Sequence, residues 1–554
     1  MPGPVPPAKP KRVRAAAPET ARAFGRSRAD FGELLPAESA LLECCREGRS
    51  ARISEAVPDE EQNANRVRAD FVRFLALGGD EDTPIHERGV SLEGAWLTGL
   101  LDLSSAKIEY PLSLWSCRIE EIRATQAHFA VLNLIGCRLE RGLLGDRISC
   151  DGGVYFRDGF HTSGEVRLLG ATIGGNLECQ RSRFDNGKDD ALSCDGARIS
   201  GDLFFRGAHI SGKVRLHGVV VGGDVDCEGA KFENPGEHAL SCDGALVSGS
   251  VFLRSGCRVS GMARLLGMTV GGDLDCRGAH FENPGSLAIT CDSAQVKRRF
   301  LFRSIETLKG GVDLSSLKVT DLSDDVDSWP ASSGLLVLDG FTYNRLTGGA
   351  STDAATRIAW LEKQMPDFLG KDFRPQPWEQ LIQVLRIMGH PGDARALAIA
   401  KQERLRRAGK IVRGARALHW LYGLLVGYGY RPIRLLAATA SVWLICFLAY
   451  WAATNPAWFG AETHLLAAQP AKPGEPVPAP DYRNFVPLIY SADVLLPVVD
   501  LGYKDEWQPV VADRAGNPLI WGQLLRFLYW FEIAFGWVAG LLLVGVLGNL
   551  IKKD

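Results

Sequence analysis

Residues 193–240 have the sequence SCDGARISGDLFFRGAHISGKVRLHGVVVGGDVDCEGAKFENPGEHAL, and residues 241–289 have the sequence SCDGALVSGSVFLRSGCRVSGMARLLGMTVGGDLDCRGAHFENPGSLAI. The second stretch copies the first. Two columns of cysteine mark the period: Cys179, Cys227 and Cys276, and Cys194, Cys242 and Cys291. Successive members of a column are 48 and then 49 residues apart. Self-similarity with such a period is typical of repeat architectures.

Within one copy, short groups of apolar residues alternate with Gly, Ser or Asp. A helix needs apolar residues at a spacing of about 3.6, and glycine at this density destabilises helices. Very short strands joined by tight turns fit better, and four of them make a coil of roughly 20 residues. A copy therefore predicts two coils plus a loop. We place the loop at Phe232–Leu240 and at Phe281–Ile289, because Asn-Pro-Gly is turn chemistry.

The repeat resembles the units of pentapeptide-repeat and related right-handed β-helix proteins, as in the pieces GARI, SGDLF, RGAHI and SGKVRL. The resemblance extends over residues 88–335. Gly-Ala and Ser-Gly variants replace the usual alanine–aspartate/asparagine–leucine pentapeptide. The resemblance implies a mainly β fold, a right-handed parallel β-solenoid, which we place at 88–345. We expect a helical N-terminal cap before it, and a helical connector and two transmembrane α-helices after it.

The N-terminal region has two parts. Residues 1–35 are basic and rich in Pro and Ala, without the apolar core of a signal peptide, so we predict a disordered, solvated tail. Solenoid ends need caps, and we place a helical cap at 36–87. Its helices are expected at Glu38–Gly48 and Asn65–Leu77.

Cysteine and aspartate columns are candidate metal sites. The chain has no C-x-x-C pair and no zinc-type spacing, so we interpret the six cysteines above as small apolar residues of the solenoid core, in a reducing compartment. Aspartates recur at the following positions: Asp195, Asp243 and Asp292, and Asp224 and Asp273. The nine-residue glycine–aspartate pattern of calcium-binding repeats is absent, which favours turn capping and solvation. We expect neither a metal nor another cofactor.

A helical connector is expected at 350–412. Thr352 or Asp353 can cap a helix that runs to Met365. Two further helices separated by Gly389–Gly392 resemble a single tetratricopeptide-like hairpin. One hairpin does not demand a peptide ligand, so we favour a structural role.

Two apolar runs near the end predict transmembrane helices at 435–453 and 527–551. Residues 413–434 are basic and aromatic, and suit a helix that lies along the membrane interface. Nine Lys and Arg residues lie between 401 and 434, and Lys552 and Lys553 follow the second run, but residues 454–526 carry only five. The positive-inside rule therefore places both termini and the solenoid in the cytoplasm, at a bacterial inner membrane.

The segment 484–509, within the extracytoplasmic loop 454–526, is too apolar for an ordinary solvent loop. It suits a re-entrant or interfacial element. Helix, re-entrant segment, helix is the layout of two-helix ion channels, in which Asp493, Asp500 or Glu532 would line a cation pathway. The alternative is an extracellular amphipathic cap with solvated acids.

Gly536 and Gly540 form a G-x-x-x-G pattern in the second apolar run. Such residues allow close helix approach. They predict packing against the first span or, in a homo-oligomer, against another subunit.

The chain as a whole resembles bacterial membrane-associated proteins with pentapeptide-like repeats. The resemblance rests on the segment Gly78–Gly99, the solenoid, FRPQPWEQL at Phe373–Leu381 and YSADVLLPVVDLG at Tyr490–Gly502. Some members are called membrane-associated oxidoreductases, but we do not carry that activity over to this chain. The chain has no dinucleotide fingerprint, redox C-x-x-C, zinc-protease, nucleophile-elbow or Walker motif, and we expect no enzyme.

Three hypotheses remain: a membrane-tethered scaffold whose solenoid face binds a protein partner, an oligomeric channel or sensor, and an enzyme of redox or carbohydrate type. The lipid bilayer is the expected partner of the C-terminal helices. The formal charge of −2 argues against nucleic acid as a partner.

Overall fold

The computed structural model describes residues 27–408, 413–455, 465–468, 485–512 and 516–551. The chain forms two compact units. The first comprises residues up to 369 together with 374–394, and the second comprises 370–373 and the residues from 395 onward.

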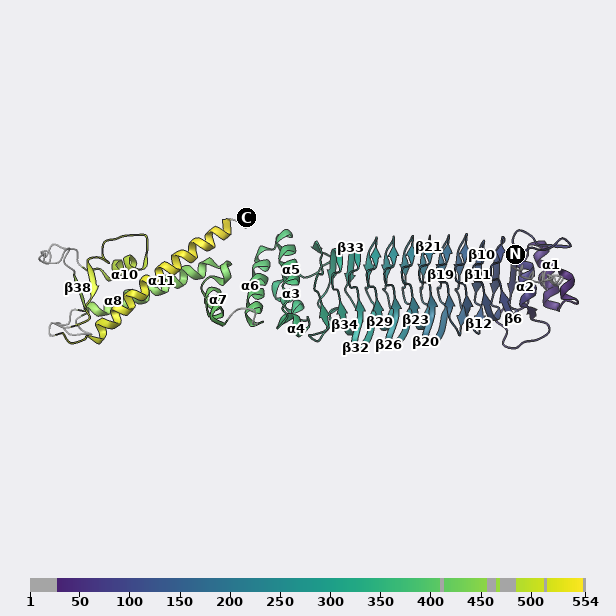
Figure 1. The fold of residues 1–554 in the computed structure, drawn as a ribbon, viewed down its shortest axis with the longest axis horizontal. Helices are drawn as coiled ribbons and strands as arrows, with labels where there is room; N and C mark the ends of the chain where they lie inside the picture. The colour runs from purple at the N-terminus through teal and green to yellow at the C-terminus, as the bar shows by residue number, and fades with distance from the viewer. Residues whose placement is uncertain (1–26, 409–412, 456–464, 469–484, 513–515, 552–554) are drawn as a thin grey trace, which may run out of the picture. The chain divides into compact units, whose positions relative to one another are not determined.

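The first unit is dominated by a parallel β-solenoid of about 11 turns, which confirms the predicted solenoid (Figure 1). One coil holds β21 (Arg198–Ile199), β22 (Leu203–Phe204) and the two ends of β23 (His209–Arg215). Arg198 pairs with Val220 of the next coil, and Val220 with Leu246 of the one after. The coils therefore advance by 22 and then 26 residues (220 − 198 and 246 − 220), so a 48-residue copy is two coils.

The strands belong to two large sheets that share this coiling. The first contains β1 (Ala51–Arg52), β5 (Val90–Glu93), β7 (Lys107–Ile108), β8 (Leu112–Trp115), β10 (His128–Phe129), β11 (Leu132–Ile135), β14 (Ser149–Cys150), β15 (Val154–Tyr155), β18 (Thr172–Ile173), β19 (Leu177–Glu178), β21, β22, β24 (Val220–Val221), β25 (Val225–Asp226), β27 (Leu246–Val247), β28 (Val251–Phe252), β30 (Thr269–Val270), β31 (Leu274–Asp275), β33 (Gln295–Phe302), β35 (Lys318–Asp324) and β37 (Arg345–Leu346). The second contains β2 (Arg66–Arg68), β6 (Trp96–Asp102), β9 (Arg118–Arg123), β12 (Arg138–Leu139), β13 (Leu143–Leu144), β16 (His161–Thr162), β17 (Val166–Arg167), β20 (Arg183–Ser193), β23, β26 (Lys231–Ser241), β29 (Arg258–Arg264), β32 (His280–Thr290), β34 (Thr307–Asp313) and β36 (Leu336–Val337).

The prediction that 232–240 and 281–289 form irregular loops is wrong. They lie within the long strands β26 and β32, whose pairing with the next coil shifts register around the exposed Pro-Gly tip. An Asn side chain closes each excursion: the Asn234 amide donates to the His238 carbonyl, and the Asn283 amide to the Leu287 carbonyl. Gly261 lies beside the first excursion with φ +124°, which requires glycine.

The N-terminal end carries a small cap that contains α1 (Pro36–Glu47), α2 (Ala69–Ala76) and the hairpin of β3 (Gly79–Asp80) and β4 (Thr83–Pro84). Residues 1–26 of the predicted tail lie outside the described residues. The prediction that the tail stays disordered as far as residue 35 is wrong for 27–35. Here η1 (Arg28–Phe31) places the Phe31 ring 5.1 Å from Phe71 and 5.4 Å from Phe74, which buries it.

At the other end of the solenoid, α5 (Gln376–Ile387) covers the last coil. The Gln376 side chain accepts from the Gly340 amide and donates to the Phe341 carbonyl, and Gln380 donates to the Tyr343 carbonyl. These side chains satisfy backbone groups that an uncovered sheet edge would expose. The segment around FRPQPWEQL is therefore a C-terminal cap.

Two shorter helices precede α5. Asp353 caps α3 (Ala354–Leu361) by accepting from the Thr356 amide at 2.8 Å, as one of the two predicted caps. The helix ends at Leu361, before the predicted Met365. α4 (Pro366–Leu369) follows, and α6 (Pro391–Arg407) leads from the first unit into the second.

The second unit contains α7 (Arg413–Val426), η2 (Gly427–Gly429), α8 (Pro432–Thr454), α10 (Pro487–Leu495), α11 (Ile520–Ile551) and the strand pair β38 (Leu466–Ala468) and β39 (Trp507–Pro509). α8 and residues 520–546 of α11 are long and apolar enough to span a membrane. Only 17 % of the most apolar stretch of each is buried. α10 packs against both helices.

Candidate functional site

The cysteine columns lie in the solenoid core, but the cysteines do not stack on one another. Backbone pairing places a Phe or Leu between successive cysteines. The columns run Phe156, Cys179, Phe205, Cys227, Leu253, Cys276 and Phe302, and Leu168, Cys194, Leu216, Cys242, Leu265, Cys291 and Leu314. All six cysteines are buried and free. Burial raises the pKa of the Cys242 thiol to about 12, which leaves it protonated and unreactive.

An outer column of the solenoid alternates between aromatic and acidic residues. Its members are Tyr155, Glu178, Phe204, Asp226, Phe252 and Asp275. Arg206 lies over the Phe204 ring at 5.4 Å and donates to Asp226 of the next coil at 2.6 Å. In the same way, Arg157 contacts the Tyr155 ring and Glu178 of the next coil, and Arg254 contacts the Phe252 ring and Asp275 of the next coil.

Two members of the predicted column Asp195, Asp243 and Asp292 have arginine partners. Arg215 binds Asp195, and Arg264 donates to Asp243 at 3.1 Å, each across one coil. In the second aspartate column, the Asp224 carboxylate accepts from the Ser250 amide at 2.7 Å. Asp195 and Asp243 thus pair with arginine, and Asp224 accepts a hydrogen bond from a backbone amide of the next coil. In the described part of the chain, no three His, Cys, Asp or Glu side chains are grouped to hold a metal ion.

These columns explain why the repeat is two coils long. Neighbouring coils of a parallel solenoid stack at about 4.8 Å, so a one-coil repeat would place acid on acid and large ring on large ring. Like charges directly opposite one another destabilise a sheet, and overfilled cores are strained. Alternation between two coils avoids both problems.

A further outer column carries one basic residue in each of eight consecutive coils. Its members are Arg118, Arg138, His161, Arg183, His209, Lys231, Arg258 and His280. Acids lie beside it on several coils: for example, Asp185 lies 3.1 Å from His161 and 2.6 Å from Arg183. The exposed excursion tips lie on the same long strands. This side of the solenoid combines charge with protruding backbone.

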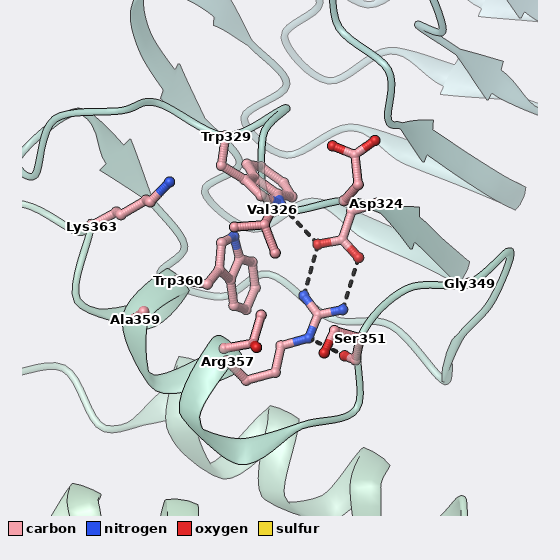
Figure 2. A pocket seen from close by; sticks show the side chains of 11 residues that line it. Asp324, Val326, Trp329, Gly349, Ser351, Arg357, Ala359, Trp360 and Lys363 are labelled. Atoms are coloured by element: carbon pink, nitrogen blue, oxygen red, sulfur yellow. Dashed lines mark hydrogen bonds and ion pairs between the residues drawn. The ribbon is translucent and has the colours of Figure 1, made fainter.

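A cavity of about 240 Å³ lies between the last coils and α3 (Figure 2). The Trp329 and Trp360 rings, 5.5 Å apart, form part of its wall, and Lys363 also lines it. Burial lowers the pKa of the Lys363 ammonium. Arg357 donates both terminal nitrogens to Asp324, which also accepts from the Trp329 indole, so these polar groups hold the cavity wall together.

The three acids predicted for a pore have different environments. The Asp493 side chain is buried and accepts from the backbone amides of Leu501, Tyr503 and Lys504 at 2.7, 2.8 and 2.8 Å. Asp493 therefore folds the segment after α10 back on itself. Asp500 lies in that segment, and its side chain is 66 % exposed.

Glu532 of α11 is fully buried. The Tyr450 hydroxyl of α8 lies 3.0 Å from its Oε2, and the Ser491 hydroxyl of α10 contacts its Oε1. The carboxyl group thus joins three helices. Glu532 and Asp493 both have structural partners, so the pore hypothesis gains no support from the described residues.

Gly536 and Gly540 face the segment that follows α10. A Cβ added at Gly536 would overlap the Leu495 carbonyl oxygen, and one at Gly540 would lie 3.6 Å from the Pro497 ring. Among the described residues, the backbone at 495–497 occupies this face rather than the first span, and packing against another subunit stays a prediction. The missing side chains instead allow the backbone at 495–497 to approach α11.

The residues that complete these clusters were not identified from the sequence. Tyr450 and Ser491 lie 82 and 41 positions from Glu532, and Arg357 lies 33 from Asp324. No local spacing connects them. The aromatic–acid column did carry a signal, because Phe204 and Phe252 recur with the 48-residue period.

Comparison of the chain with protein-family models, with curated proteins and with solved structures found no match.

Proposed function

We propose that this protein is a membrane-anchored scaffold, whose β-solenoid offers an interaction surface on the cytoplasmic face of a bacterial inner membrane. The proposal rests on one observation: the same chain contains a solenoid of about 11 turns and two apolar helices that are largely exposed. Core helices of soluble proteins are mostly buried. Exposed Leu, Ile, Trp and Phe side chains on α8 and α11 suit acyl chains instead.

The orientation rests on charge. Exposed arginines precede α8 at positions 407, 416 and 431, and Arg434 lies in its first turn, whereas the region between the two helices carries few basic residues. The positive-inside rule then places the solenoid in the cytoplasm.

The side of the solenoid that carries the basic column is the proposed partner surface. The arginines of the aromatic–acid column are engaged by rings and carboxylates of their own face. The basic column also has carboxylate partners, such as Asp185, but its Lys231 is exposed and the exposed tip at Pro235–Glu237 lies on the same strand. A regular, rigid surface of this kind binds an extended partner at low entropic cost.

Two experiments test the proposal. Alkaline carbonate should leave the full-length protein in the membrane pellet, whereas extraction into the supernatant contradicts anchoring. For orientation, an impermeant maleimide added to intact spheroplasts should label Asp500→Cys but not Lys188→Cys, two exposed positions. Both should react after permeabilisation. Labelling of Lys188→Cys alone in intact spheroplasts would reverse the topology.

A further inference from the structure

Helix α7 has one face committed to the two apolar helices. Val426 is buried in a cluster with Leu435 of α8 and with Ala539 and Val546 of α11. Tyr422 and Leu425 pack against this cluster. The end of α7 therefore packs against the first turns of α8 and against the part of α11 that contains residues 539–546.

The part of the α7 surface that adjoins this packed face is also apolar, but it is exposed. Leu418, Trp420, Leu421 and Leu424 are 69 %, 51 %, 40 % and 55 % exposed. At about 100° per residue these four side chains fall within one half of the helix circumference. Soluble proteins rarely leave such a continuous apolar face in water.

Exposed arginines flank this face. Arg416 lies on α7, Arg431 immediately precedes α8, and Arg434 lies in its first turn. Across the described ranges, no carboxylate lies within ion-pairing distance of these three side chains. Three cations next to an apolar face match the chemistry of an anionic phospholipid layer, with acyl chains beside headgroup phosphates.

We propose that α7 lies in the headgroup layer of the cytoplasmic leaflet and binds anionic phospholipid. Leu418, Trp420, Leu421 and Leu424 enter the acyl boundary, and Arg416, Arg431 and Arg434 bind lipid phosphate. This rests on the proposed membrane anchoring, because α8 and α11 bring α7 to that depth. The lipid surface is continuous with the one that covers the two spanning helices.

The first test measures lipid selectivity. Full-length protein is reconstituted in phosphatidylcholine vesicles with and without phosphatidylglycerol, re-extracted in mild detergent, and analysed for co-purified lipid. The wild type should retain phosphatidylglycerol several-fold above its share of the vesicle. The variant R416Q/R431Q/R434Q should lose this enrichment, while the matched variant K188Q/R198Q/R345Q, with the same charge change on the solenoid, should keep it. Equal enrichment in all three proteins would overturn the assignment.

Inorganic phosphate distinguishes the source of the anion. If excess phosphate abolishes the enrichment, the arginines form a site for free phosphate and the lipid proposal fails. If enrichment persists, the apolar face contributes to binding as proposed.

The second test measures depth with a nitroxide at Leu421→Cys in the same vesicles. Collisions with oxygen should exceed those with a water-soluble nickel chelate, the reverse of the result at Lys188→Cys. Nickel accessibility at 421 overturns the interfacial position, and inaccessibility to both reagents assigns this face to protein packing. If either of these two outcomes is found and the wild type still resists carbonate extraction, the α7 proposal fails but the proposed membrane anchoring stands. If carbonate extracts the wild type, the proposed anchoring itself fails.

Discussion

Arg357 and Asp324 form a buried bidentate ion pair in the first unit. The two terminal nitrogens of Arg357 lie 2.7 and 2.8 Å from the two Asp324 oxygens, and the side chains are 3 % and 2 % exposed. The pair joins β35 to α3 and thereby fastens α3 to the last coils of the solenoid (Figure 2).

We expect Asp324→Leu or Arg357→Leu alone to lower the free energy of unfolding by about 3–5 kcal/mol, because each leaves an unpaired buried charge. The double variant should lose less than either single variant. Urea titration of the full-length protein in detergent, followed by far-ultraviolet circular dichroism, measures this difference. Additive losses would contradict the pairing.

Two leucines on the same sheet should respond differently to a charge. Leu274 is 2 % exposed and Leu246 is 48 % exposed. Leu274→Asp buries a charge next to Asp273 and Asp275, and should destabilise the solenoid by more than about 3 kcal/mol. Leu246→Asp should change stability by less than about 1 kcal/mol. Equal melting temperatures of the two variants would show that the inward register is wrong.

The two-coil alternation can be broken at Phe204. Phe204→Asp would place a third carboxylate between Glu178 and Asp226 and would remove the ring beneath Arg206. We expect it to cost about 1–3 kcal/mol more than Phe204→Leu, which removes the ring without adding charge. Thermal unfolding at low and high salt is the measurement. The difference in stability between Phe204→Asp and Phe204→Leu should become smaller at high salt. A difference that does not depend on salt would argue against charge repulsion.

Acid should weaken the solenoid through its arginine-bound carboxylates. Burial opposes ionisation of Asp275 and Asp273, but hydrogen bonds from Arg277 and Arg299 outweigh it and hold both pKa values below 3.8. Since the folded pKa is depressed, this stabilisation is present above pH 3.8 and is lost as the pH falls through the depressed values. Urea midpoints over a descending pH series test this.

The matched variants for that series are R277Q/R299Q and Arg198→Gln. R277Q/R299Q should show a smaller loss of stability below pH 3.8, because its carboxylates have lost their arginine donors. Arg198→Gln should follow the wild type. Identical acid curves for all three proteins would rule out these arginine contacts as the source.

Replacement of Asp493 should destabilise the second unit locally, whereas replacement of Asp500 should not. Asp493→Ala removes the acceptor of three backbone amides, and should loosen residues 501–504 at a cost of about 1–3 kcal/mol. Asp500→Ala removes two exposed contacts, to the Gly502 amide and to the Lys504 ammonium, and should have little effect. Hydrogen exchange of peptides that cover 496–504 is the measurement. Similar exchange in both variants would contradict the capping role of Asp493.

Some features of this protein were predictable because they recur along the chain. The 48-residue copies, with short apolar groups between glycines, argue against helices and predict the solenoid. Local spacing also predicted Asp353 as a helix cap. Excursions such as Pro235–Glu237 were misjudged, because backbone pairing on either side draws the segment into a strand although the tip has turn chemistry.

The sequence by itself determined the repeating coils and the two long apolar helices, since periodicity and apolar length are local properties that act before distant segments meet. Only the tertiary structure decided what stands beside each polar or small residue. Tyr450 reaches Glu532 across 82 positions, and Gly536 accommodates the Leu495 backbone instead of a neighbouring span. Such partners depend on how helices pack in three dimensions, and no spacing along the chain encodes that geometry.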